Sequence, residues 1–300
     1  MFTPPGFEQR SVKTSLGEMV YYTAASTPWL NEDAVAREQE QETLVFLHGF
    51  GGGSSAYEWS KVYPALAADY RIVAPDLIGW GRSNHPARNY RIEDYLTTIA
   101  EFIEQTCSGG ARAIASSLTA AFTIRVAIAR PDLFKSLILT TPSGLADFGD
   151  NYANTLFAQL AGVPILDRVF YTAGVANKNG IRAFLEQRQF ANPNRVYEEI
   201  VDAYLESALQ KNAEYAALSF VRGDLSFDLS LYVPQLTIPT GIIWGRKSQF
   251  TSPEVGQRLA NLNPEAIQFF EHLEDVGLTP QLELPAVTIG LIRKFLQQLG

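Results

Sequence analysis

The sequence predicts an α/β protein with a mostly parallel central sheet that is flanked by helices and interrupted by one inserted block of helices. Three observations lead to this prediction. Short apolar runs alternate with helical patterns across residues 43–143 and again across residues 234–300. The residues between these two parts, 144–233, have helical patterns alone. The chain of 300 residues is 46% hydrophobic and 19% charged, so it can bury a full core.

The segment that precedes this alternation is predicted to hold one strand and one loop. Residues 18–23 have strand composition and follow a turn at residues 15–17. Residues 28–42 are polar and acidic. We expect an exposed loop there rather than a functional acidic patch, because charged runs are usually solvated surface.

From residue 43 onward, strands and helices alternate. Buried strands are predicted where short apolar runs occur, and helices where apolar residues recur at steps of three and four. This alternation is typical of parallel strands joined by right-handed crossovers. The predicted strands are residues 43–47, 71–74, 111–115, 136–140, 240–244 and 267–270, and the predicted helices are residues 56–68, 92–107, 118–130, 253–262 and 284–299.

The helical block over residues 144–233 is predicted to form a cap. It separates two strands of a parallel sheet, and ligands bind at the carboxyl ends of such strands. The core of the sheet would then comprise residues 1–143 and 234–300. The block also carries 13 of the 31 Phe and Tyr residues. Ordinary packing explains most of this enrichment, and the remainder favours a hydrophobic, lipid-like or terpenoid-like ligand.

The composition argues against several classes of protein. A net charge of −8 and a pI near 5.0 disfavour nucleic-acid binding, which needs a basic patch. The single cysteine, Cys107, excludes an internal disulfide and a cysteine-based zinc site, and it fits a cytoplasmic location. We expect neither a secretory signal nor an integral membrane protein, because no suitable apolar run is present. No metal, nucleotide or flavin motif occurs, so we expect no cofactor.

Three ordered stretches carry the most specific signal. The first is a strand that enters a His-Gly, glycine-rich turn, LVFLHGFGGGSS at 44–55. The second is a strand and a Gly-Trp-Gly-Arg-Ser turn, APDLIGWGRSNHP at 74–86. The third is a strand, a sharp turn of small residues, a helix and a strand at 113–144. Together they resemble the α/β-hydrolase superfamily, and within it α/β-hydrolase-like proteins of cyanobacteria. The resemblance implies the α/β-hydrolase fold with a helical cap.

The resemblance implies a serine nucleophile on a strained strand-to-helix turn. In Ala115-Ser116-Ser117-Leu118-Thr119 that position is Ser117. Ala115 and Thr119 stand where the family has glycines, and Thr119 is β-branched where space is tight. By position, the oxyanion hole of the family would use the backbone N–H groups of Phe50 and Leu118.

The resemblance also implies an acid after the strand at 240–244 and a histidine near the carboxyl end. The acid position, four residues after Trp244, holds Ser248. The histidine position, after Gly277 and before a Pro-x-x-Glu-x-Pro stretch, holds Leu278. Two of the three triad positions are therefore substituted.

Other residues could in principle replace the missing groups. His48 belongs to the His-Gly turn, where a structural, hydrogen-bonded role is usual, and His85 is expected at the surface. His272 lies at the end of a predicted strand, six residues before Leu278. The candidate substitute acids are Asp147, Asp150 and Asp275. An acid without a histidine does not rebuild the mechanism.

The missing base decides the functional expectation. In serine proteases, loss of the base alone lowers kcat by roughly 10⁶, and about 10³–10⁴ over water remains. We therefore expect a non-catalytic or very weakly active pseudo-hydrolase that binds a hydrophobic small molecule or a protein partner. One alternative is a serine hydrolase or acyltransferase that uses Ser117 with an unconventional base on an ester or lipid-like substrate. A purely structural interaction role is the other.

Overall fold

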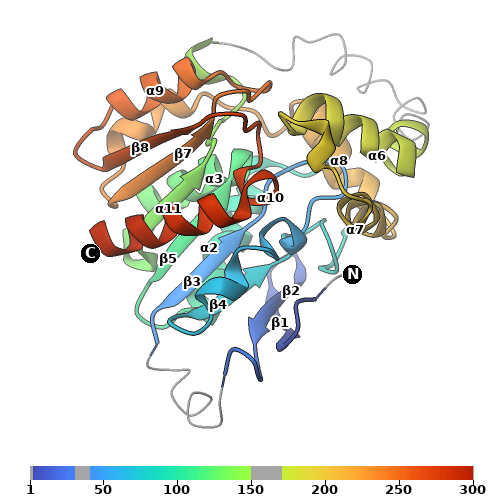
Figure 1. Cartoon of the computed structure of the whole chain (residues 1–300), viewed down its shortest axis with the longest axis horizontal. Helices are drawn as coiled ribbons and strands as arrows, with labels where there is room; N and C mark the ends of the chain where they lie inside the picture. The colour runs from blue at the N-terminus through green and yellow to red at the C-terminus, as the bar shows by residue number, and fades with distance from the viewer. Residues whose placement is uncertain (1–2, 31–40, 150–170, 300) are drawn as a thin grey trace.

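The computed structural model describes residues 3–30, 41–149 and 171–299. At its centre lies an eight-stranded sheet in the order β1-β2-β4-β3-β5-β6-β7-β8 (Figure 1). β2 runs antiparallel to both of its neighbours, and the other adjacent strands run parallel. The predicted mostly parallel sheet is thus confirmed. The strands are β1 (Phe7–Thr14), β2 (Gly17–Ala24), β3 (Thr43–Leu47), β4 (Arg71–Pro75), β5 (Ala111–Ser116), β6 (Phe134–Thr140), β7 (Thr240–Gly245) and β8 (Ile267–Leu273).

Helices cover both faces of the sheet because the central strands are apolar on both faces. In β3, Val45 and Leu47 face one hydrophobic cluster, whereas Leu44 and Phe46 face the other. The first cluster includes residues of the helices α2 (Ile92–Thr106), α3 (Ser117–Ala129) and α9 (Pro253–Asn261). The second includes residues of α11 (Pro285–Gln298) and of two short 3₁₀ helices, η1 (Ala56–Trp59) and η2 (Tyr63–Leu66).

Most of the predicted elements agree with the structure to within a few residues, and one does not. Residues 56–68 were predicted to form a single helix but fold as η1 and η2. Pro64 explains the break, because it has no N–H to donate to the preceding turn and its ring crowds that turn. Strand β1 was not predicted; most of its residues are at least partly exposed, so it lacks a clear apolar pattern. Residues 31–40 of the predicted loop lie outside the described residues.

The described part of residues 144–233 forms helices at one end of the sheet, on the right in Figure 1. The α-helices there are α6 (Lys178–Phe184), α7 (Glu198–Ala208) and α8 (Ala213–Val221). α7 packs directly on the turn after β3. A Cβ on Gly53 would lie only 2.1 Å from the Tyr204 carbonyl oxygen, and Ser207 Oγ donates to the Ser54 carbonyl at 3.1 Å. These helices therefore adjoin the carboxyl end of β3.

In the described parts of the chain, none of the helices combines the length and the apolar character that crossing a membrane requires.

Candidate functional site

Ser117 lies where the chain turns from strand β5 into helix α3. Its φ is 56°, a left-handed value that costs a non-glycine residue on the order of 1–3 kcal/mol. The preceding residue, Ser116, is extended with φ −118°. Ser117 is 92% buried, with 8% of its surface exposed. This geometry turns the side chain out of the strand direction at the carboxyl end of the sheet, as a nucleophile elbow does.

Thr119, which stands where the family has glycine, is accommodated inside α3. The residue is fully buried, and its Oγ1 has no hydrogen-bond partner among the described residues. Its carbonyl oxygen accepts a bond from Thr123 Oγ1 at 2.8 Å. The β-branched side chain is therefore compatible with the turn at Ser117.

The turn after β3 is held by the imidazole of His48. The ring is fully buried; Nδ1 donates to the Gly49 carbonyl oxygen at 2.7 Å, and Nε2 accepts the Leu77 N–H at 3.0 Å. Burial lowers the pKa of His48 to about 4, so the ring is neutral at pH 7. The C=O of Gly49 and the N–H of Phe50 belong to one planar trans peptide and point in opposite directions. His48 therefore sets the direction of the Phe50 N–H.

Two backbone donors are available beside Ser117. Leu118 is the second residue of α3, so its N–H has no partner within the helix. Neither this N–H nor that of Phe50 donates to another described residue. β3 and β5 are neighbours in the sheet, with Leu47 opposite Ala115, so the turns that follow them lie side by side. This arrangement can bind a carbonyl oxygen.

The position predicted for the acid, residue 248, holds a serine rather than a carboxylate. Ser248 Oγ is buried and has no partner among the described residues, while the Ser248 N–H donates to the Gly245 carbonyl at 3.1 Å. The candidate substitute Asp275 is exposed and forms an ion pair with Lys247 at 2.5 Å. Asp275 is therefore committed to a surface contact.

The position predicted for the histidine is occupied by the buried side chain of Leu278, which is 6% exposed. The Leu278 N–H donates to the Gln189 carbonyl oxygen at 2.8 Å. Next to it, Glu283 Oε1 accepts the Gly277 N–H at 2.6 Å and Glu283 Oε2 accepts the Ala191 N–H at 2.8 Å. Burial raises the pKa of Glu283, and these hydrogen bonds oppose the rise. The loop at the histidine position is thus fastened to residues 189–191.

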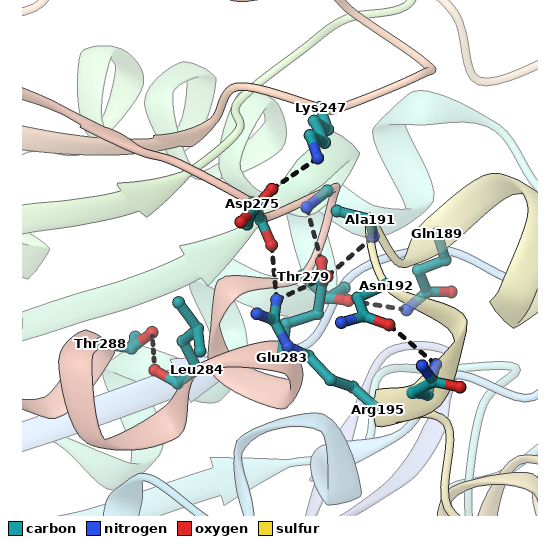
Figure 2. Close-up of polar contacts among 12 residues, drawn as sticks. Gln189, Ala191, Asn192, Arg195, Lys247, Asp275, Thr279, Glu283, Leu284 and Thr288 are labelled. Carbon is teal, nitrogen blue, oxygen red and sulfur yellow. Dashed lines mark hydrogen bonds and ion pairs between the residues drawn. The ribbon is translucent and has the colours of Figure 1, made fainter.

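Figure 2 shows how residues 189–195 meet this loop. Arg195 Nη1 donates to the Asp275 carbonyl oxygen at 2.5 Å and lies 3.6 Å from Glu283 Oε2. Gln189 Nε2 lies 3.4 Å from Thr279 Oγ1. Contacts therefore run along both sides of Leu278, and the backbone around this position is well held.

The three histidines make their contacts elsewhere. His85 Nε2 lies 3.1 Å from the Gly81 carbonyl oxygen, and the His272 ring packs edge-on against Phe270 at 4.9 Å between centroids. The pKa of both residues is lowered, chiefly by burial. No histidine nitrogen of the described chain, which includes all three rings, forms a hydrogen bond with the Ser117 hydroxyl.

Asp147, the candidate acid after β6, is committed to the backbone at the start of the insertion. Its Oδ2 accepts the Ser143 hydroxyl at 2.7 Å, and its Oδ1 accepts the N–H groups of Gly144 at 3.1 Å and Leu229 at 3.0 Å. Burial raises its pKa against these bonds. Asp150, the other candidate, lies outside the described residues.

Two polar residues near Ser117 were not identified from the sequence. Glu58 is 1% exposed, and its Oε2 accepts the Gly49 N–H at 2.8 Å. Gln281 is fully buried and donates from Nε2 to Ser116 Oγ at 3.2 Å. The one available signal for Glu58 was its place between two aromatic residues, in the run Tyr57-Glu58-Trp59. In the described parts of the chain, no three His, Cys, Asp or Glu side chains are grouped so as to hold a metal ion.

A family model, curated relatives and solved structures all indicate the α/β-hydrolase fold. A model of the "Alpha/beta hydrolase family" matches residues 44–290. "Lipase 1" of Psychrobacter immobilis is 26% identical over 81% of this chain and 73% of the lipase. "Karrikin insensitive 2 receptor IA" of Petunia hybrida is 25% identical over 84% of this chain and 89% of the receptor. The epoxide hydrolase VrEH1 of Vigna radiata superposes with a TM-score of 0.76 and 19% identity, over 98% of this chain and 99% of that one.

Proposed function

The chain belongs to the α/β-hydrolase family, and we propose that it is a member that binds a ligand and hydrolyses esters very slowly or not at all. The proposed ligand is a hydrophobic small molecule with a polar oxygen, which the Phe50 and Leu118 N–H groups would bind. The sequence leaves a protein partner open as the other class of ligand.

One observation carries this proposal: the position of the general base holds the buried, apolar Leu278. A serine hydroxyl is a weak nucleophile until a neighbouring base accepts its proton. The Ser117 hydroxyl has no histidine partner, and the ring of His48 is already bonded through both nitrogens. The expected loss in kcat is on the order of 10⁶ relative to a complete triad.

The names of the relatives support a binding role for a protein with this fold. They include proteins named lipases and proteins named karrikin insensitive receptors, at similar identity and coverage. Because the relatives include proteins of both names, this fold can serve as a scaffold for hydrolysis or for recognition.

The hydrophobic character of the ligand is supported by apolar side chains over the glycine turn. Phe184 Cε1 would lie 3.4 Å from a Cβ on Gly51, and the Phe184 ring is 6.2 Å from that of Phe250. Val175 packs so closely on Gly52 that a Cβ there would meet it at 2.1 Å. We propose that residues 144–233 act as a cap whose apolar side chains enclose the body of the ligand.

The test compares the unmodified protein with Ser117→Ala. Hydrolysis of p-nitrophenyl butyrate should proceed at the same rate in both proteins, and a fluorophosphonate probe should label neither. Binding of medium-chain ketones, measured by calorimetry, should nevertheless be detectable in both. Hydrolysis or labelling that depends on Ser117 would overturn the non-catalytic proposal.

The second candidate is a serine hydrolase or acyltransferase that acts on an ester or lipid-like substrate with an unconventional base. The left-handed backbone of Ser117 and the two available N–H donors favour it, because strained residues persist where function uses them. It predicts labelling of the unmodified protein and none of Ser117→Ala, so the same experiment separates the two candidates.

A further inference from the structure

Glu58 is a buried carboxyl group that the proposed function does not yet use. It lies in η1, and its two oxygens face different parts of the molecule. Oε2 accepts the Gly49 N–H at 2.8 Å, and Oε1 accepts the Tyr204 hydroxyl of α7 at 3.0 Å. Glu58 thus joins the turn after β3 to the inserted helices.

Both backbone polar groups of Gly49, the N–H and the C=O, are therefore hydrogen-bonded to side chains. Glu58 Oε2 accepts its N–H, and His48 Nδ1 donates to its carbonyl oxygen at 2.7 Å. Because the Phe50 N–H belongs to the peptide that starts at this carbonyl, the two bonds together fix where that N–H points. A Cβ on Gly49 would lie 3.4 Å from Glu58 Oε2 and 3.5 Å from Ser117 Cβ. The carboxyl group therefore acts next to Ser117 without bonding to it.

We propose that Glu58 is a positioning residue of the ligand site: its carboxylate holds the Gly49 N–H and thereby keeps the Phe50 N–H directed at the ligand oxygen. This inference rests on the proposed function, in which that oxygen binds to Phe50 and Leu118. Tyr204 completes the arrangement, because its hydroxyl also accepts a bond from Gln189 Nε2 at 2.8 Å.

The cost of burying the Glu58 carboxyl group favours a specific role for this residue over incidental packing. Each of the two carboxyl oxygens accepts a bond from a donor in a different segment, and a buried acceptor that loses its donor carries a desolvation penalty. Burial raises the pKa of Glu58, while the bonds from the Gly49 N–H and the Tyr204 hydroxyl act in the opposite direction. A buried carboxyl group is costly to the fold, and these two donors, one in the turn after β3 and one in α7, compensate that cost.

A matched control lies one residue away. The Tyr57 hydroxyl donates to Glu199 at 2.7 Å and also joins η1 to α7 by a tyrosine–carboxylate bond. The bond between Tyr57 and Glu199 does not involve the turn at Gly49. Tyr57→Phe should therefore remove one bond between η1 and α7, as the Glu58 variants do, and leave the Phe50 N–H in place.

The first experiment measures hydrogen exchange of the Gly49 and Phe50 amides by NMR in the unmodified protein, Glu58→Gln, Glu58→Met and Tyr57→Phe. Exchange at Gly49 should accelerate in a graded way, with Gln intermediate, because the amide oxygen of Gln can still accept one neutral bond. The chemical shift of the Phe50 N–H should move in both Glu58 variants. Tyr57→Phe should leave both amides unchanged.

The second experiment measures binding of nonan-2-one and of non-1-ene, which has a similar chain without the carbonyl oxygen. Glu58→Met should reduce the preference for the ketone by roughly three- to tenfold, the value of one neutral hydrogen bond. Binding of the alkene should stay the same. A structural defect alone would weaken both compounds together.

The outcomes separate this inference from the proposed function. If the unmodified protein binds neither compound, the proposed ligand class fails, and the amide measurements alone decide whether Glu58 positions the turn. Unchanged Gly49 and Phe50 amides in Glu58→Met would overturn the inference whatever the binding data show. A ketone preference that survives in Glu58→Met would also overturn it.

Discussion

The Leu278 N–H and the Gln189 carbonyl oxygen are joined by a 2.8 Å hydrogen bond. This bond connects the position that would hold the catalytic histidine to the inserted residues. With the Gly277 and Ala191 N–H groups both bonded to Glu283, the backbone at this position is held from two sides. The backbone at the predicted histidine position is therefore well supported, and the prediction can be tested by placing a histidine there.

Restoring the triad should create measurable esterase activity. In Ser248→Asp with Leu278→His, an imidazole would stand at the base position, with a carboxylate at the position that orients it. Hydrolysis of p-nitrophenyl butyrate should become detectable, although far slower than in a natural esterase, because the residues around the new groups are not arranged to support them. The buried environment of Leu278 should lower the pKa of the new imidazole, and the new carboxylate should oppose this shift.

The control for this gain is the same double variant with Ser117→Ala added. All of the new activity should disappear, because the hydroxyl is the only nucleophile that the restored pair would activate. Activity that persists without Ser117 would contradict the assigned roles of positions 248 and 278.

The fold could be predicted from the sequence because its signals are local. The apolar runs at residues 43–47 and 240–244 match strands almost residue for residue, and the other predicted strands of the parallel sheet match to within a few residues. Pro64 is also visible in the sequence, but the prediction of a single helix over residues 56–68 rested on helical spacing alone. Strand β1 gave none, because it is an edge strand paired only with β2 and buries few of its side chains.

The site could be predicted only where a motif fixes the position. Ser117 follows a strand and opens a helix, and this pattern is visible in the sequence. Glu58 and Gln281 act through contacts with Tyr204 and Ser116, which lie 146 and 165 residues away from them in the sequence. A single sequence does not show which distant residues pair, and the aromatic neighbours of Glu58 indicate burial but not its partners.

The left-handed backbone at Ser117 should lower the free energy of unfolding, and a substitution that relieves the strain should raise it. Ser117→Gly should raise the free energy of unfolding by up to about 1 kcal/mol, because glycine adopts a φ of 56° without a steric penalty. Ala115→Gly, within strand β5, should instead lower it by roughly 0.5–1 kcal/mol. Urea denaturation followed by tryptophan fluorescence measures both. A destabilised Ser117→Gly would mean that the turn holds no recoverable strain.

The buried carboxyl of Asp76 should make stability fall as the pH rises. Burial raises its pKa from 3.8 to about 6, against bonds from the N–H groups of Ala56 and Arg82. Because the folded state holds the proton more tightly than the unfolded state, the stabilisation is complete below about pH 4 and is lost as the pH passes 6. The loss is about 3 kcal/mol. Relative to Asp76→Asn, the wild type should therefore lose stability between pH 4 and 7, as measured by urea denaturation; a constant difference would contradict the shift.

The close approach of α7 to the turn after β3 should depend on one glycine. At Gly53, φ is +96° and a Cβ would lie 2.1 Å from the Tyr204 carbonyl oxygen, so Gly53→Ala meets both backbone strain and a clash with main chain. The free energy of unfolding should fall by at least about 2 kcal/mol. Gly290→Ala is the matched control, since no atom lies within 4 Å of a Cβ at this position in α11.

Gly290→Ala should stabilise the protein by roughly 0.5–1 kcal/mol, because alanine favours the helix more than glycine does. The opposite signs of the two substitutions separate a specific contact from a general effect of alanine. Thermal denaturation of both variants should show a lower Tm for Gly53→Ala and a higher Tm for Gly290→Ala. If Gly53→Ala kept the Tm of the wild type, α7 would have to sit farther from the turn, and the bond between Tyr204 and Glu58 could not form as described.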